Sequence, residues 1–387
     1  MKKILLVDDD VTIREIYRQK FIRDGFEVET AANGLLAAQS LRTSKPDLVV
    51  LDLLMPQLSG VDVLKFIRST RAIENIPVII FTNSFLTDLA EAASKLGIQR
   101  AVIKGQCSPN ELVAIIREIL SSKTAGDDKS SAPAAQPETR TKPIEPADAS
   151  QKVRQQFFES APATLSLLRQ LYQDFDQCDD PAALGLRLND FYRKVHFVTS
   201  IAGMAGCHRI ALLGGAFEAL LFELQRRPDH IDASTSRTIT AAMDFLEVLF
   251  DDARNLSAET PAQAKVLIVD DDPLSNHLAV AALRNAQLQA QAADDPLVAL
   301  ELLRQRQYDL VLLDIEMPHM NGFDVCRKLR TFPGYANTPV IYVTAHHDFE
   351  NRASGTLAGG NDFIAKPIFP IELALKAVMH LLKSQLG

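Results

Sequence analysis

Carboxylates, a hydroxyl and an ammonium group occur twice in this chain at matching positions. An apolar run followed by three aspartates stands at 4–10 and returns at 266–272. Each residue of the second set lies 262 positions after its counterpart, and no insertion or deletion separates the anchors. Two copies of one domain are therefore predicted. The matched pairs are Asp8/Asp270, Asp9/Asp271, Asp52/Asp314, Gly60/Gly322, Pro77/Pro339, Thr82/Thr344 and Lys104/Lys366.

The combination of these residue types points to phosphate chemistry. Three carboxylates gathered in one place repel one another, so their ionised form needs a compensating charge. Mg²⁺ prefers oxygen ligands, keeps several waters and accepts a phosphoryl oxygen, and it therefore suits such a cluster. A lysine adds a second positive charge for the same group, and a threonine adds a hydrogen bond. We therefore predict in-line phosphoryl transfer to a carboxylate nucleophile.

The elements expected around these residues would bring them together. In the first copy, short apolar runs at 3–7, 26–31, 47–51, 77–81 and 101–103 are typical of parallel strands buried on both faces. Amphipathic stretches alternate with them at 11–24, 33–43, 60–70, 86–96 and 109–122. Five strands alternating with five helices predict an open, doubly wound α/β domain, whose strand carboxyl ends share one rim. The aspartates, the threonine and the lysine all follow strands, so we expect them to meet at that rim.

Between the two copies the sequence changes character twice. Residues 123–150 contain four prolines among small and polar residues, which indicates a flexible linker. Residues 151–260 show apolar residues spaced by three and four, with breakers at Asp180-Pro181, Gly206 and Pro228. Four amphipathic helices with short connections predict an antiparallel four-helix bundle. The predicted domains are 1–122, 123–150 as the linker, 151–260 and 263–387.

Composition excludes several classes of protein. The net charge is −8 and no part of the chain is basic, which argues against a dedicated nucleic-acid surface. The apolar runs are too short to span a bilayer or to act as an export signal, so we expect no membrane association. The four cysteines lie far apart without metal-ligand spacing, which fits a reducing cytoplasm.

Both copies resemble response regulator receiver domains, and the resemblance covers 1–122 and 263–387. It implies a flavodoxin-like (βα)5 fold in which Asp52 and Asp314 accept phosphate from a phosphohistidine. It also implies that Asp9 and Asp271 bind Mg²⁺ directly, with Asp8 and Asp270 assisting, while Thr82, Thr344, Lys104 and Lys366 hold the phosphoryl group. Phe363, three residues before Lys366, stands where the family has a rotating aromatic switch. Ala101 stands there in the first copy, which puts conventional output switching of that copy in doubt.

His196 is the second candidate for phosphate chemistry. Ser200 and Gly203 follow it by four and seven positions, so small residues share its helix face and leave the imidazole open to a partner domain. The middle region resembles the histidine-containing phosphotransfer domain, a four-helix bundle with one phosphorylatable histidine. That family usually has lysine three residues and glycine four residues after the histidine, whereas this chain has Thr199 and Ser200.

These observations predict a cytoplasmic two-component signalling protein with three functional parts. In the first hypothesis, phosphate moves between an aspartate, His196 and the other aspartate, and a histidine kinase or phosphotransfer protein supplies or receives it. In the alternative, the protein is a non-catalytic adaptor whose receivers sense phosphorylation and whose bundle binds a downstream protein, with His196 inert. A third hypothesis makes it the regulatory half of a larger output enzyme. The sequence leaves open whether the protein is an enzyme beyond phosphotransfer and self-dephosphorylation.

Overall fold

A computed structural model describes residues 1–55, 58–82, 93–104, 107–124, 147–178, 180–253, 264–286, 288–344 and 358–386. The chain divides into two compact units, one made of Met1–Ala161 and Phe197–Cys207 and the other of Pro162–His196 and His208–Gly387. Most of the predicted linker and most of the helix predicted at 86–96 lie outside the described residues. Among the described residues, no helix is long and apolar enough to cross a membrane.

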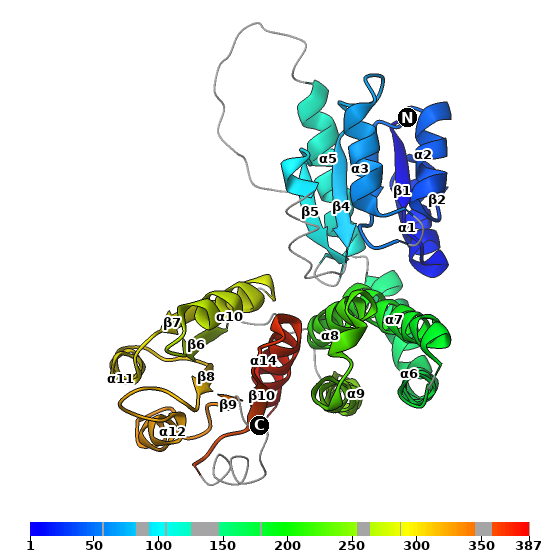
Figure 1. Ribbon diagram of the computed structural model, residues 1–387. Helices are drawn as coiled ribbons and strands as arrows, with labels where there is room; N and C mark the ends of the chain where they lie inside the picture. The colour runs from blue at the N-terminus through cyan, green and yellow to red at the C-terminus, as the bar shows by residue number, and fades with distance from the viewer. Residues whose placement is uncertain are drawn as a thin grey trace, which may run out of the picture. The chain divides into compact units, whose positions relative to one another are not determined.

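The first α/β domain contains a five-stranded parallel sheet with the order β2-β1-β3-β4-β5 (Figure 1). Every residue of β3 and β4 is buried, because helices cover both faces of the sheet, whereas in the edge strand β2 only the last residue is buried. The strands are β1 (Lys3–Val7), β2 (Glu27–Ala31), β3 (Leu48–Leu51), β4 (Val78–Thr82) and β5 (Arg100–Ile103). The helices are α1 (Val11–Arg23), α2 (Gly34–Thr43), α3 (Gly60–Ser69) and α5 (Pro109–Thr124).

The second α/β domain repeats this architecture, with the sheet order β10-β9-β8-β6-β7. The prediction of two parallel α/β sheets, made from the repeated anchors and from the alternation of apolar runs with amphipathic stretches, is therefore confirmed. The strands are β6 (Lys265–Val269), β7 (Gln289–Ala293), β8 (Leu310–Asp314), β9 (Val340–Thr344) and β10 (Asp362–Ala365). The helices are α10 (Pro273–Asn285), α11 (Pro296–Gln305), α12 (Gly322–Leu329) and α14 (Pro370–Ser384).

The third aspartate of each triplet begins a helix. The side chain of Asp10 accepts hydrogen bonds from the backbone N–H groups of Thr12 and Ile13, and thus caps α1. Asp272 caps α10 in the same way. An N-cap carboxylate satisfies backbone donors that have no partner within the helix. The triplet therefore combines two functions, because its first two residues stay at the rim while the third fixes the helix that follows.

The middle region is helical, as predicted, and its described part contains four long helices. These are α6 (Ala147–Asp176), α7 (Pro181–Met204), α8 (His208–Arg226) and α9 (Ala233–Ala253), with a short 3₁₀ turn, η2 (Pro228–His230), before α9. Aromatic contacts join three of the helices: Phe191 on α7 lies 5.9 Å from Tyr172 on α6 and 5.6 Å from Phe217 on α8, measured between ring centroids. Arg169 on α6 forms ion pairs with Asp244 and Glu247 on α9.

Candidate functional site

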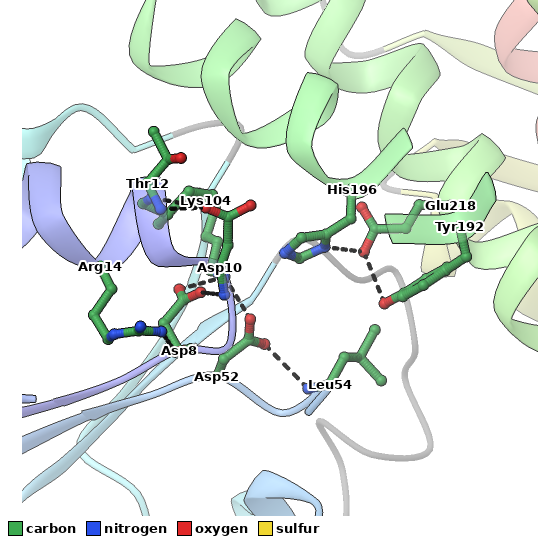
Figure 2. Close-up of polar contacts among 11 residues, drawn as sticks. Asp8, Asp10, Thr12, Arg14, Asp52, Leu54, Lys104, Tyr192, His196 and Glu218 are labelled. Carbon is green, nitrogen blue, oxygen red and sulfur yellow. Dashed lines mark hydrogen bonds and ion pairs between the residues drawn. The ribbon is translucent and has the colours of Figure 1, made fainter. Parts of the chain in front are cut away.

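The first acidic cluster lies where β1, β3 and β5 end. Asp8 follows β1, Asp52 follows β3, and Lys104 follows β5, so the sheet brings residues far apart in the sequence to one rim. Carboxylate oxygens of Asp8, Asp9 and Asp52 lie within 4.8 Å of one another. The Lys104 ammonium forms ion pairs with Asp52 and, at 2.7 Å, with Asp8 (Figure 2). The predicted aspartates and lysine of the first copy are therefore close together.

The second acidic cluster has the same arrangement at the ends of β6, β8 and β10. Carboxylate oxygens of Asp270, Asp271 and Asp314 lie within 4.8 Å of one another. The Lys366 ammonium lies 2.6 Å from Asp314 and 3.1 Å from Asp270. The threonines are the last residues of their strands, Thr82 in β4 and Thr344 in β9, and both are buried. The Thr344 carbonyl also accepts a hydrogen bond from the backbone N–H of Lys366.

Backbone and side-chain donors hold the aspartates in place. The N–H of Leu54 donates to the Asp52 carboxylate at 3.1 Å, and the N–H of Glu316 donates to Asp314 at 3.3 Å. Arg14 donates to the backbone carbonyl of Asp8, and Asn276 to that of Asp270, both at 2.6 Å. Neither Arg14 nor Asn276 was predicted from the sequence to belong to the site. Their signal was the repeat itself, because they occupy equivalent positions in the two copies.

The electrostatics of the second cluster favour binding of a divalent cation. Burial and the neighbouring charge of Asp270 raise the pKa of Asp314 above its ordinary value, although Lys366 acts against them. Burial alone would lower the pKa of Lys366, but the hydrogen bonds and charges of Asp314 and Asp270 raise it overall. With the three carboxylates ionised, one ammonium leaves two negative charges uncompensated. Three clustered carboxylate oxygens are also the ligands that Mg²⁺ prefers, so the residues present fit this ion.

A glycine permits the helix after each central aspartate to approach the cluster. A Cβ atom at Gly60 would lie 2.0 Å from the backbone oxygen of Asp52, and one at Gly322 would lie 2.3 Å from that of Asp314. Backbone atoms cannot move away cheaply at such distances. The glycines at these positions therefore set how closely α3 packs against the end of β3 and α12 against the end of β8.

We expect Gly322→Ala to destabilise the second α/β domain by about 3 kcal/mol, since overpacking usually costs about 1–3 kcal/mol and here the clash is with backbone. Denaturant unfolding of the full chain, followed by probes in each domain, measures the loss. Gly185→Ala is the matched control, because Gly185 is an exposed position of α7 with no atom within 4 Å of the added Cβ. That substitution should stabilise by about 0.5–1 kcal/mol. Equal effects of the two substitutions would contradict the packing argument.

Phe363 lies on β10, beside the second cluster. Its ring centroid is 5.4 Å from that of Tyr342 on β9, and Tyr342 in turn contacts Phe323 on α12 at 5.0 Å. The preceding residue, Asp362, accepts hydrogen bonds from Lys376 and pairs with His380, both on α14. In the first domain the corresponding position is Ala101 on β5, and no aromatic ring is available there.

Asp362 should make the second domain sensitive to acid. Its burial acts to raise the pKa, but the hydrogen bond with His380 and the charge of Lys376 outweigh burial and hold the pKa well below the ordinary 3.8. A lowered folded-state pKa stabilises the fold above the unfolded value, and the stabilisation is lost as the pH falls through the folded value. We expect Asp362→Asn to cost about 2 kcal/mol at pH 7. The difference from wild type should shrink below about pH 4.

Unfolding measured at pH 7 and at pH 3 checks this prediction. Asp294→Asn, which changes an exposed loop carboxylate of the same domain, should leave stability within about 0.5 kcal/mol at both values. A cost for Asp362→Asn that does not depend on pH would contradict the assignment of the stabilisation to the ionised carboxylate.

His196 lies on α7, where its side chain is buried rather than open as predicted, and it contacts a buried carboxylate. Its Nδ1 atom is 2.9 Å from a carboxylate oxygen of Glu218 on α8, and the Tyr192 hydroxyl donates to the same oxygen at 3.5 Å (Figure 2). Glu218 is fully buried. Glu218 was not predicted from the sequence to have a role. The signal was a single acidic residue within the apolar run from Ala216 to Leu221.

Parts of the chain are similar to known response regulators and their receiver domains. The response regulator receiver domain family matches residues 4–117 and 266–378. The DNA-binding response regulator MtrA of Mycolicibacterium smegmatis is 35% identical over 121 residues, which are 31% of this chain and 52% of MtrA. The dual master transcriptional regulator RpaA of Synechocystis is 35% identical over 119 residues, 31% of this chain and 49% of RpaA. The chain thus spans about half the length of these relatives. The receiver domain of the Francisella response regulator 1452 is 28% identical, with a TM-score of 0.29, and the match covers 31% of this chain and 98% of that domain.

Proposed function

The chain belongs to the response regulator receiver domain family, and from this membership we propose that it is a Mg²⁺-dependent phosphorelay protein. Receiver domains act in two-component signalling with histidine kinases or phosphotransfer proteins, which are therefore the expected partners. In the proposed relay, Asp52 and Asp314 accept phosphate and His196 passes it between aspartates. The observation that carries the proposal is the pairing of each acceptor aspartate with a lysine inside an acidic cluster.

The residues of each cluster have separable roles. Asp9 and Asp271 would hold the cation, with Asp8, Asp270 and the acceptor aspartates completing its ligands. When bound, Mg²⁺ supplies positive charge that a phosphoryl group needs in order to approach three carboxylates. Lys104 and Lys366 then bind a phosphoryl oxygen, and Thr82 and Thr344 donate a hydrogen bond to another.

The chemical step is a displacement at phosphorus. A carboxylate oxygen of Asp314 attacks the phosphorus of a phosphohistidine, an O–P bond forms and the P–N bond breaks. The imidazole leaves with the electron pair of the broken bond. The lysine, already within hydrogen-bond distance of the acceptor, neutralises charge on the transferring group without further movement of the backbone. The same step applies to Asp52 with Lys104.

We assign the phosphotransfer role to His196 in a four-helix bundle formed by α6 to α9. Glu218 supports this assignment because a carboxylate at Nδ1 favours the tautomer with its proton on Nδ1 and the lone pair on Nε2. Nε2 is then the nucleophile, and attack on an aspartyl phosphate releases the aspartate carboxylate. Glu218 also stabilises the positive charge that develops on the imidazole when the N–P bond forms.

An adaptor without relay activity is the second candidate. The specific observation in its favour is Thr199, which stands three residues after His196, where the phosphotransfer family has a lysine. A positive charge near the phosphorylated imidazole is missing at that position. In this reading the receivers are still phosphorylated, and the helical region binds a protein partner. The names of MtrA and RpaA describe DNA binding, but the similarity covers about half of each, so we do not carry that function to this chain.

Cysteine chemistry supports a reducing cytoplasm as the proposed compartment. The four cysteines are free, and three of them, Cys107, Cys207 and Cys326, are buried. Burial raises the pKa of the thiols of Cys107 to about 12 and Cys207 to about 11, so both are expected to be inert at neutral pH.

Labelling with phosphate distinguishes the two candidates. The full chain is incubated with Mg²⁺ and labelled acetyl phosphate, and the label is classed by its stability. Acyl phosphates are lost in base, whereas phosphohistidine is lost in acid. The relay requires both classes of label, and the adaptor requires the acyl class alone. The absence of any label in the presence of Mg²⁺ would reject both.

A further inference from the structure

Helix α14 of the second receiver is covered on every side. Ten of its fifteen residues are buried, including Glu372 and Lys376, which would be exposed on an ordinary outer helix of an α/β domain. One side of α14 faces its own sheet and α10. The other side packs against α8 and α9 of the helical region, within the same compact unit (Figure 1).

Specific contacts fix the alignment of α14 with α9. At the start, the rings of His230 and Phe369 stack at 4.3 Å and 5°. Further along, Glu372 accepts hydrogen bonds from the hydroxyls of Ser234, at 2.9 Å, and Thr238, at 2.7 Å. Near the end, the Lys383 ammonium lies 5.2 Å from the centre of the Phe245 ring. Because the contacts ascend along both helices together, the two helices run parallel.

Glu372 makes this contact specific to the second receiver. A buried carboxylate is costly unless donors satisfy it, and here two hydroxyls of α9 do so. The equivalent residue of the first receiver is Asn110, and the equivalent of Lys376 is Ala114. The first copy therefore lacks both charged groups that the second copy buries in this region.

Lys376 stands between the interface and the strand that carries Phe363. Its ammonium lies 2.9 and 3.0 Å from the two carboxylate oxygens of Asp362. Glu372 precedes Lys376 by four residues, so the two side chains share a helix face, with the acid on the N-terminal side that favours pairing. A change of rotamer would therefore let Lys376 pair with either of two carboxylates: Asp362 on β10 or Glu372 at the contact with α9.

We propose that Lys376 couples the second receiver to the helical region by exchanging Asp362 for Glu372. In this structure Lys376 pairs with Asp362, Glu372 is left to the hydroxyls of Ser234 and Thr238, and α14 is docked on α9. A phosphoryl group on Asp314 adds nearly two negative charges beside Lys366, which directly follows β10. The strand β10, whose first residue is Asp362, then shifts as a unit, Lys376 turns from Asp362 to Glu372, and Glu372 releases the hydroxyls of α9. This coupling rests on the proposed phosphorylation of Asp314.

The interface itself is tested without phosphate. Hydrogen exchange of α9 is measured in the full chain for Glu372→Gln, Thr238→Val and the double variant. Each single change should speed exchange about tenfold, equivalent to about 1.4 kcal/mol for one lost hydrogen bond to a charged group. The double variant should be no faster than Glu372→Gln alone, since the charged hydrogen bond that Thr238→Val removes is one of the two that Glu372→Gln removes. If the double variant sped exchange of α9 by the product of the two single effects, the proposed interface would be overturned. The control is Glu301→Gln on α11, which should leave the exchange rate of α9 unchanged.

The coupling is tested with Mg²⁺ and acetyl phosphate, with adduct formation followed by intact mass. In the wild type, we expect the adduct on Asp314 to speed exchange of α9, and in Lys376→Gln the adduct should form without that effect. An adduct that leaves α9 unchanged in the wild type would overturn the coupling while the phosphorylation stands. An absent adduct on Asp314 would overturn the proposed function of that residue and the coupling with it. The hydrogen-exchange test of the interface with the Glu372 and Thr238 variants does not depend on whether Asp314 is phosphorylated or on whether the adduct affects α9.

Discussion

Asp314→Asn should reduce the base-labile phosphate on the second receiver by at least about a hundredfold, and Asp52→Asn should do the same for the first. Removal of a nucleophile eliminates the chemical step rather than weakening it. An amide cannot replace the carboxylate, because it is neutral, a poor nucleophile and a poor ligand for a divalent cation. It also removes the negative charge that pairs with the Lys366 ammonium at 2.6 Å.

The paired receivers give this prediction an internal control. Each single variant should retain the label of the intact receiver, and the double variant should retain no base-labile label. Asp294→Asn tests whether the loss of any carboxylate from the second receiver is enough to reduce its phosphate label. We expect this variant to leave labelling unchanged. Peptide mapping of the label provides the measurement. Label that persists in Asp314→Asn and maps to Asp271 would show that the neighbouring carboxylate is the acceptor.

The repeat made both receiver folds and both clusters predictable. Lys104 and Asp8 are 96 positions apart, yet the order of strands in a doubly wound sheet places them at one rim, and their ion pair of 2.7 Å agrees with that placement. The strand boundaries differ from the prediction by one residue or so, since apolar runs do not mark where hydrogen bonding stops. The stretch 83–92, which includes most of one predicted helix, lies outside the described residues and leaves that prediction untested.

Contacts between helices were much less predictable. Glu372 lies in an amphipathic stretch and from the sequence reads as a solvent-facing position, whereas Glu218 stands out within an apolar run without any indication of its partner. Their burial depends on which helix packs against them, His196 on α7 in one case and Ser234 and Thr238 on α9 in the other. Periodicity identifies the apolar face of a helix but not its neighbour, so a carboxylate with a partner on another helix cannot be distinguished from a solvated one.

His196→Ala should eliminate the acid-labile, base-stable phosphate while leaving the acyl phosphates of Asp52 and Asp314 intact. The imidazole is the only group of the proposed relay that can carry a phosphorus–nitrogen bond. The label is measured after treatment of the protein with acid and with base in parallel. Acid-labile phosphate that persists in His196→Ala would require another histidine, and its mapping would replace His196 in the relay. Label confined to the aspartates in the wild type would favour the adaptor.

The Glu218→Gln variant tests whether Glu218 orients the His196 imidazole for phosphate transfer or only lies beside it in the core. We expect phosphate transfer through His196 to slow by at least about tenfold, less than the roughly 10⁴-fold loss when the orienting carboxylate of a serine protease triad is replaced. Nitrogen NMR of the imidazole should show a smaller share of the tautomer with the proton on Nδ1, because glutamine is a weaker acceptor than the ionised carboxylate at 2.9 Å. Glu223→Gln on the same helix, where Glu223 pairs with Arg226 and Arg227, should change neither quantity. If transfer slows while the tautomer population is unchanged, Glu218 has a structural role in α8. If transfer and the tautomer population change together, Glu218 positions Nε2 of His196.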